Sequence, residues 1–160
     1  MRRALLLALL AVPAWGQNVL VNPGFEDGLA GWTADVARAG SVTLDGHAHS
    51  GDASALVLAP TQMPSAAAIW QEVRVSKGGH YCVSAWLQPW TDGAGFGLLV
   101  DSREDRLVEL LAHGPAGAWG WQRACFTAPR WRLRVTITAS KGVMVGGGYV
   151  DDVRLEPVAY

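Results

Sequence analysis

The chain has 160 residues, half of them hydrophobic, and a formal net charge of −1 at pH 7. A chain of this length suits a single domain built around one hydrophobic core. With 13 basic and 14 acidic residues and no long basic run, nucleic acid is not expected as a partner.

The first 16 residues, MRRALLLALLAVPAWG, have the layout of a secretory signal peptide. Two arginines precede a short apolar run, and small residues stand at Ala14 and Gly16, the −3 and −1 positions of a cleavage site. The apolar run is too short to cross a bilayer comfortably, and an uncleaved N-terminal anchor is the alternative. Cleavage after Gly16 predicts one mature domain over residues 17–160 without a transmembrane segment, either secreted or held in the cell envelope or periplasm.

Short runs of β-branched and aromatic residues predict strands along the whole mature chain, separated by turns rich in Gly, Pro, Asp and Ser. Because no helices alternate with them, the sequence predicts an all-β fold, a two-sheet antiparallel β-sandwich. One segment, REDRLVELLAHG at 103–114, fits a helix or a hairpin strand equally well. The expected strands are residues 53–59, 68–75, 81–90, 95–102, 121–129, 131–140 and 149–155.

Alternation assigns the side chains of these strands to faces. In 81–88 the odd-numbered side chains are expected in the core and the even-numbered ones on the opposite face. In 121–129, Arg123 and Cys125 face away from the core, and in 131–140 the even-numbered side chains do so. We therefore expect one sheet with an outer surface that carries Trp86, Gln88, Arg123, Arg132 and Arg134.

The two cysteines, Cys82 and Cys125, are predicted to form a disulfide. An even number of cysteines in an exported chain favours pairing, and both side chains lie on matching strand faces. Bridged Cα atoms should lie about 4.4–6.8 Å apart. Paired free thiols on adjacent strands are the alternative.

Five segments follow one another over nearly all of the mature chain: NVLVNPGFEDGLAGW (18–32), AHSGDASALVL (48–58), WQEVRVSKGGHYCVSAWLQP (70–89), GWQRACFTAP (120–129) and GGYVDDVRLEP (147–157). Together, and in this order, they resemble the carbohydrate-binding modules of the 4/9/22 group. The resemblance implies a jelly-roll β-sandwich with a galactose-binding-like topology, a structural calcium ion and, often, a glycan bound in a concave face.

The resemblance also implies the ligands of the calcium ion. The matching residues are Glu26, Ser50 and Asp151, with loop carbonyls completing the roughly 6–8 oxygen ligands that Ca²⁺ prefers. Alternation in 149–155 places Asp151 on the apolar side of its strand, where an unpaired carboxylate is costly. Asp152 is a reserve ligand. The alternative is that the carboxylates at both ends of the chain turn outward.

The sequence does not indicate catalysis. Glycoside hydrolysis needs two carboxyl groups that face each other, whereas adjacent carboxylates in a strand point to opposite faces. No GxSxG motif for serine chemistry occurs. His47 and His49 could chelate a transition metal, although a solvated hairpin is the favoured interpretation. We therefore expect a protein that is not an enzyme.

Tryptophan is abundant, with eight residues. Partly exposed indoles stack on sugar rings while Gln and Arg side chains hydrogen-bond the hydroxyls. The resemblance implies that Trp32 and Trp121 are core or rim anchors, so both are expected to pack. The predicted glycan-binding surface comprises Trp86, Gln88, Trp90, Trp119, Arg123 and Arg134. Its arginines favour an anionic glycan, and the alternatives are a solvated strand face and rings that cover the ends of the sandwich.

Two functions follow from these observations. The first is an exported, non-catalytic module that binds a cell-envelope or environmental polysaccharide, or a cell-surface glycan. The second is a structural cell-surface protein that uses the jelly roll to pack against cell-envelope proteins. Exposed indoles flanked by Gln and Arg in a groove favour the first function, and buried indoles with a flat Arg/Thr sheet face favour the second.

Overall fold

The computed structural model of the chain describes residues 16–35, 41–59, 66–92, 95–103, 105–140 and 146–159. Within these ranges the secondary structure consists of strands and turns without any helix, so the predicted all-β class is confirmed. The predicted signal peptide lies outside the described residues except for Gly16. Among the described residues, no helix has the length and apolar character needed to span a membrane.

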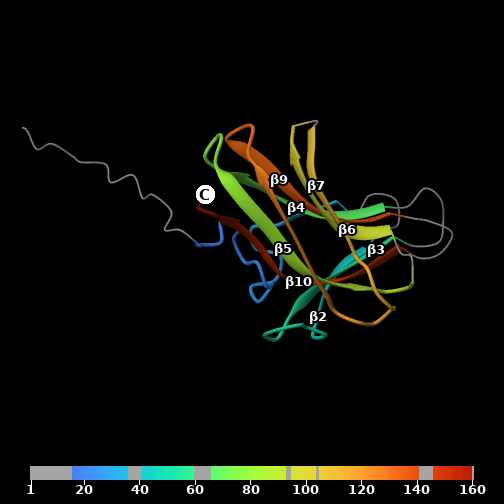
Figure 1. Cartoon of the computed structure of the whole chain (residues 1–160). Coiled ribbons are helices and arrows are strands. Elements are labelled where there is room, and N and C mark those ends of the chain that lie inside the picture. Colours follow the sequence, from blue (N-terminus) through green and yellow to red (C-terminus); the bar gives the residue numbers. More distant parts are fainter. Residues whose placement is uncertain are drawn as a thin grey trace, which may run out of the picture.

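The strands form two five-stranded antiparallel sheets that pack as a sandwich (Figure 1). Sheet A has the strand order β1-β4-β9-β6-β7, and sheet B has the order β2-β3-β10-β5-β8. Figure 1 shows β5 and β10 side by side, and the two are paired along most of their length. The bounds are β1 Thr33–Asp35, β2 Ser41–Asp45, β3 Ser54–Ala59, β4 Ala66–Arg74, β5 His80–Pro89, β6 Gly95–Ser102, β7 Asp105–Leu111, β8 Gly120–Thr127, β9 Arg132–Ser140 and β10 Gly146–Pro157.

The segment that fitted a helix or a strand forms β7, which makes a hairpin with β6. Its burial alternates with a period of two, since Val108 and Leu110 are 7% exposed while Glu109 and Leu111 face solvent. An ion pair between Arg106 and Asp101 joins the two strands near the turn. The segment's pairing with β6, which its own residues do not reveal, therefore favours the strand over the helix.

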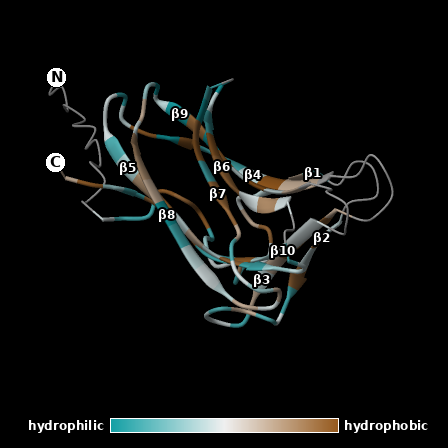
Figure 2. Ribbon diagram, turned by 45° about the vertical axis from the view of Figure 1, so that its right-hand side comes forward, coloured by the Kyte–Doolittle hydropathy of each residue, from teal (hydrophilic) through white to brown (hydrophobic). Residues whose placement is uncertain are grey.

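The core between the sheets confirms the predicted alternation. In β5, the side chains of Tyr81, Val83, Ala85 and Leu87 are at most 4% exposed. The corresponding residues of β9 (Leu133, Val135 and Ile137) are at most 1% exposed. Figure 2 shows a hydrophilic segment within β8, the edge strand of sheet B.

The predicted disulfide between Cys82 and Cys125 is confirmed. The two residues are directly opposite each other in the β5–β8 pairing, and their Cα atoms are 4.0 Å apart, slightly closer than expected. The bond ties the edge strand β8 to the interior of sheet B.

Removing this disulfide is expected to lower the free energy of unfolding by about 2–4 kcal/mol, because the bond restricts the unfolded chain. It links residues separated by 43 positions. The measurement is urea unfolding of the Cys82→Ser/Cys125→Ser double variant beside the oxidised parent. Equal midpoints for the two proteins would contradict this expectation.

The expectation that one outer surface carries all five predicted residues is wrong, because their strands belong to two different sheets. Strands β5 and β8 belong to sheet B, whereas β9 belongs to sheet A. Arg132 and Arg134 therefore lie on the opposite side of the sandwich from Trp86 and Arg123. Alternation assigned each side chain to an outward face, but it carries no information about which sheet a strand joins.

Candidate functional site

The segment 18–32 lies against β10 and frames one side of the candidate site. The side-chain amide of Asn18 donates to the carbonyl of Val153 at 2.9 Å, and its oxygen accepts from the N–H of Leu155 at 2.9 Å. Phe25 is fully buried against Trp32, with ring centres 5.3 Å apart. The expectation that Trp32 packs in the core is thus confirmed, and Glu26 follows directly after the buried Phe25.

Two carboxylates hold loop 46–53, which connects β2 to β3. Glu26 accepts hydrogen bonds from the backbone N–H groups of Asp52 at 3.1 Å and Ala53 at 3.2 Å. Asp151 accepts hydrogen bonds from the N–H groups of His49 at 2.8 Å and Ser50 at 3.0 Å. The loop is therefore held by Glu26, near the start of the domain, and by Asp151, near its end.

Asp151 is fully buried, but its surroundings differ from those predicted by simple alternation. The β5–β10 register shifts between Asp151 and Arg154, and Asp151 is the Cα partner of Trp86 on the outer face of sheet B. The carboxylate is thus buried beneath loop 46–53 and not in the core. Burial raises the pKa of the Asp151 carboxyl, and hydrogen bonds from Ser50, Asp152 and His49 oppose that rise.

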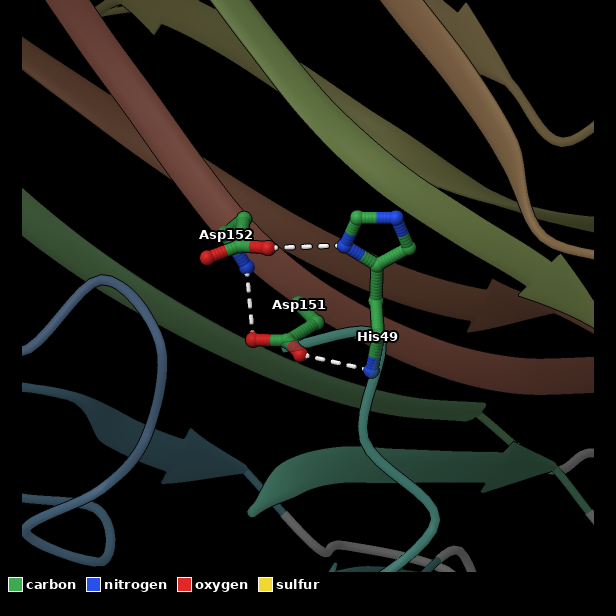
Figure 3. A group of neighbouring side chains, drawn as sticks. All are labelled: His49, Asp151 and Asp152. Carbon is green, nitrogen blue, oxygen red and sulfur yellow. Dashed lines mark hydrogen bonds and ion pairs between the residues drawn. The ribbon is translucent and has the colours of Figure 1, made fainter. Parts of the chain in front are cut away.

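Asp152 contacts the side chains of His49 and Ser50, the two loop residues whose backbone N–H groups donate to Asp151. Figure 3 shows the His49 contact. Its carboxylate lies 2.9 Å from His49 Nδ1 and accepts a hydrogen bond from the Ser50 hydroxyl at 2.8 Å. A ring nitrogen of His49 and one carboxylate oxygen each of Asp151 and Asp152 lie within 4.8 Å of one another. The structure thus brings Ser50, Asp151 and Asp152 together, while Glu26 holds the end of the loop at Asp52 and Ala53.

Gly51→Ala is expected to destabilise the protein by about 1–3 kcal/mol, because the loop needs a glycine at this position. Gly51 has φ +66°, and an added Cβ would lie within 2.2 Å of Glu26 Oε1. Gly78→Ala is the matched control, since Gly78 has φ +78° with nothing within 4 Å of its added Cβ. Thermal unfolding of the two variants should show the larger loss for Gly51, and equal losses would argue against the Glu26 contact.

An aromatic cluster lies over loop 46–53 and the end of β5. His49 stacks on Trp86, with ring centres 3.8 Å apart. His47 lies 4.9 Å from Tyr149 and 6.0 Å from Trp119, and Trp90 lies 5.9 Å from Tyr149. The histidines expected in a solvated hairpin therefore pack against aromatic rings. The cluster comprises His47, His49, Trp86, Trp90, Trp119 and Tyr149.

A pocket of about 270 Å³ opens beside this cluster, lined by His47, Gln88, Pro89, Trp90, Gly117 and Tyr149. Gln88 is 3% exposed, and its side-chain N–H donates to the carbonyl of Gly117. In the part of the chain that the structure describes, Gln88 Oε1 has no hydrogen-bond partner. An unpaired buried polar atom costs about 1–3 kcal/mol, so a hydroxyl group entering the pocket would offset that cost.

Loop 112–119, between β7 and β8, forms one wall of the pocket. The N–H of Gly117 donates to the carbonyl of Pro89 at 3.0 Å, and the N–H of Ala116 donates to the Asp92 carboxylate at 2.7 Å. These bonds fix the loop to the end of β5, so the pocket is formed before a ligand arrives.

A second hollow of about 520 Å³ on the outer face of sheet B is lined by residues that include Trp86, Trp121 and Arg123. Trp121 is 53% exposed, so the expectation that it packs is wrong. Its cross-strand partner Trp86 stacks on His49 instead, and β8 is the edge strand of sheet B among the described strands, so no neighbouring strand of that set covers the indole.

Five of the six residues predicted to bind a glycan lie on or beside sheet B, but Arg134 does not. Arg134 projects from sheet A, where it forms an ion pair with Glu72 at 2.7 Å and lies 5.4 Å from the centre of the Trp70 ring. Its hydrogen bond holds the pKa of Glu72 below the usual value. The prediction of one shared surface is therefore wrong for Arg134, and His47 and Tyr149 are pocket residues that the sequence interpretation missed.

Comparisons with known proteins agree with the resemblance seen in the sequence. Residues 17–89 match the model of the carbohydrate binding domain family CBM_4_9. No curated protein matches the sequence.

The whole sandwich is similar to solved carbohydrate-binding modules. TmCBM61, solved in complex with β-1,4-galactotriose, has a TM-score of 0.66 and 22% identity, covering 88% of this chain and 99% of that chain. A family 16 carbohydrate-binding module has a TM-score of 0.66 and 18% identity, covering 86% and 99%. The CBM22-1 xylan-binding domain from Paenibacillus barcinonensis Xyn10C has a TM-score of 0.64 and 16% identity, covering 93% and 99%. The protein therefore has the fold of carbohydrate-binding modules.

Proposed function

We propose that the chain is an exported, non-catalytic module that binds a cell-envelope or environmental polysaccharide on the outer face of sheet B. The match to a carbohydrate binding domain family and the similarity to TmCBM61 and CBM22-1 support glycan binding. The observation that carries the choice of site is the pocket beside the aromatic cluster, which is lined by Gln88, a residue whose buried Oε1 has no hydrogen-bond partner among the described residues.

The pocket offers the two interactions that sugar recognition needs. The Trp90 ring is 46% exposed, so it can stack on the apolar face of a pyranose. Gln88 Oε1 can accept a hydrogen bond from a sugar hydroxyl. Trp86 and Trp121 would extend the surface along the strands of sheet B, with Arg123 as a polar contact.

The alternative, a structural protein that only packs against other proteins, is less well supported by this face of the molecule. Trp90 and Trp121 are 46% and 53% exposed, whereas the structural role favoured buried indoles. Trp90 also lines a pocket and does not lie on a flat sheet.

Export and the absence of catalysis are parts of the same proposal. The Cys82–Cys125 disulfide supports export, because such bonds persist in oxidising compartments. The adjacent carboxylates Asp151 and Asp152 are hydrogen-bonded to loop 46–53, an arrangement that supports a structural role for the pair.

A structural calcium ion is a further part of the proposal. Asp151 and Asp152 would supply carboxylate oxygens and Ser50 its hydroxyl, the hard oxygen ligands that Ca²⁺ prefers. Burial, and to a smaller extent the negative charge of Asp152, raises the pKa of Asp151, and a cation would offset the repulsion between the two carboxylates. Glu26 as a ligand stays a prediction, since its carboxylate is hydrogen-bonded at the far end of the loop.

Calcium is expected to raise the melting temperature, and a chelator to lower it, because a ligand that binds only the folded state stabilises it. At a hundredfold excess over Kd the stabilisation is about 2.7 kcal/mol. The measurement is a thermal melt with calcium or chelator for the parent and for Asp152→Ala, in which the calcium effect should be smaller. A melting temperature of the parent that neither addition moves would show that no calcium site exists.

Glycan binding is tested with an array of neutral and acidic polysaccharides and the chain beginning at residue 17. The described residues that line the pocket include no Lys or Arg, and Arg134 lies on sheet A, so a neutral glycan is favoured over the anionic one expected from the sequence. Binding to at least one neutral polysaccharide, lost in Trp90→Ala, is the expected result. A chain that binds no glycan but captures a cell-envelope protein would support the structural alternative.

A further inference from the structure

A group of cations lies at the end of sheet A where β4 ends and β9 begins. Arg74 is the last residue of β4, and Arg132 is the first residue of β9. Lys77 lies in the turn that follows β4, and Arg130 lies in the turn that precedes β9. We call these four residues the cationic end; they gather on a chain whose net charge is −1.

Backbone hydrogen bonds hold the two turns of the cationic end together. The N–H of Val75 donates to the carbonyl of Trp131 at 3.0 Å. The N–H of Gly78 donates to the carbonyl of Ala128 at 2.7 Å, and Ala128 donates to Gly79 at 2.9 Å. Lys77 and Arg130 are thus carried by neighbouring, mutually fixed turns, and the cations form one surface.

Two of these cations stand directly opposite each other in the sheet. Arg74 and Arg132 are Cα partners in the β4–β9 pairing, and both are exposed. Like charges in this position are destabilising. The next outward-facing pair, Glu72 with Arg134, has opposite charges and forms an ion pair. Among the described residues, neither Arg74 nor Arg132 forms an ion pair, and Arg132 interacts with the Glu72 carboxylate only through its longer-range charge, which lowers the pKa of Glu72. An external anion would therefore reduce the repulsion between the two arginines.

The cationic end borders a groove of about 1010 Å³ on sheet A, to which Lys77, Arg130 and Arg132 contribute. Trp131 also lines it and is 72% exposed. Three carboxylates line the groove as well, and two of them are paired, Glu72 with Arg134 and Asp101 with Arg106, which leaves Asp105. Cations beside an exposed indole suit a sugar ring that carries an acidic group.

We propose that the cationic end binds the carboxylate or sulfate groups of an acidic polysaccharide, with Trp131 stacked on a sugar ring. Arginine forks match carboxylates and sulfates through paired hydrogen bonds. This surface lies on the sheet opposite the pocket of Gln88 and Trp90, so it would be a second glycan site and does not depend on the first.

The test uses surface-immobilised oligogalacturonate, dextran sulfate and unmodified dextran at low salt. The parent is expected to bind at least one acidic probe and to bind dextran much more weakly, with affinity that falls as salt is added. Which acidic probe binds distinguishes a carboxylate from a sulfate ligand. The Lys77→Gln/Arg132→Gln double variant should bind the acidic probe roughly tenfold more weakly. Arg154→Gln, an exposed arginine on sheet B, is the matched control and should bind like the parent.

Two further measurements test the inference: the melting temperature of Arg132→Gln, and the binding of the acidic probes by Trp90→Ala. Because Arg132 faces Arg74, Arg132→Gln should keep or raise the melting temperature while it weakens binding. Trp90→Ala should bind the acidic probes like the parent. The inference is overturned if the parent binds neither acidic probe, if Arg154→Gln loses as much affinity as the double variant, or if Trp90→Ala abolishes binding to the acidic probes.

Discussion

Replacing Asp151 with alanine is expected to lower the free energy of unfolding by at least about 3 kcal/mol. The carboxylate accepts hydrogen bonds from the backbone N–H groups of His49, Ser50 and Asp152 at 2.7–3.0 Å, in a position with no solvent exposure. Alanine leaves these donors without their acceptor, so that, among the described residues, only the side-chain contacts of Asp152 remain as hydrogen bonds between loop 46–53 and β10. The measurement is urea unfolding in the presence of a chelator, which separates this loss from any effect of calcium.

Asp27→Ala is the matched control for this prediction. Asp27 is an exposed carboxylate in the same N-terminal turn as Glu26, so its loss should change the free energy of unfolding by no more than about 0.5 kcal/mol. Asp151→Asn keeps one acceptor oxygen, so its free energy of unfolding should lie between those of Asp151→Ala and Asp27→Ala. An Asp151→Ala variant as stable as Asp27→Ala would refute the role of this carboxylate as the anchor of the loop.

Trp90→Ala is expected to weaken binding of a neutral oligosaccharide by roughly 10- to 100-fold, the size of effect typical of a ring at the centre of a contact. The melting temperature should change little, because the Trp90 ring is 46% exposed and lies outside the core. Trp90→Phe should retain part of the affinity, since a smaller ring can still stack.

Trp131→Ala is the control for this second prediction, because it removes an even more exposed indole from the opposite sheet. Calorimetric titration of the three variants with the oligosaccharide that binds best on the array measures the difference. If Trp131→Ala lost the neutral ligand while Trp90→Ala kept it, the neutral glycan would bind on sheet A and the placement proposed here would be wrong.

Much of the fold could be predicted because local pattern and tertiary structure agree. The alternation in β5 and β9 fixed the core side chains, and matching faces predicted the disulfide between Cys82 and Cys125. The type of β7 could not be predicted from its own residues, because its strand form depends on pairing with β6.

The errors have physical causes that a single strand does not reveal. Arg134 was assigned to the wrong surface because alternation gives a face but not a sheet. Asp151 was placed on the core side because the register shift in β10 inverts the alternation after it. Trp121 was expected to pack, yet it is exposed at the edge of sheet B.

The pocket was predicted only in part because four separate segments form it. Gln88 and Trp90 follow one another at the end of β5, so sequence proximity grouped them. His47 comes from loop 46–53 and Tyr149 from β10, and only the fold brings their rings within 4.9 Å. Their signal in the sequence was weak: His47 was expected in a solvated hairpin, and simple alternation placed Tyr149 on the core side of its strand together with Asp151.

The central claim, that a neutral glycan binds beside the aromatic cluster on sheet B, is tested most directly by the indole N–H signals of the protein in ¹H–¹⁵N NMR spectra. The oligosaccharide that binds best on the array is titrated into the labelled chain, with each signal assigned through single tryptophan replacements. The signals of Trp90 and Trp119 are expected to shift progressively with the ligand, and that of Trp131 to stay in place. Shifts confined to Trp70 and Trp131, with Trp90 and Trp119 unmoved, would contradict the claim.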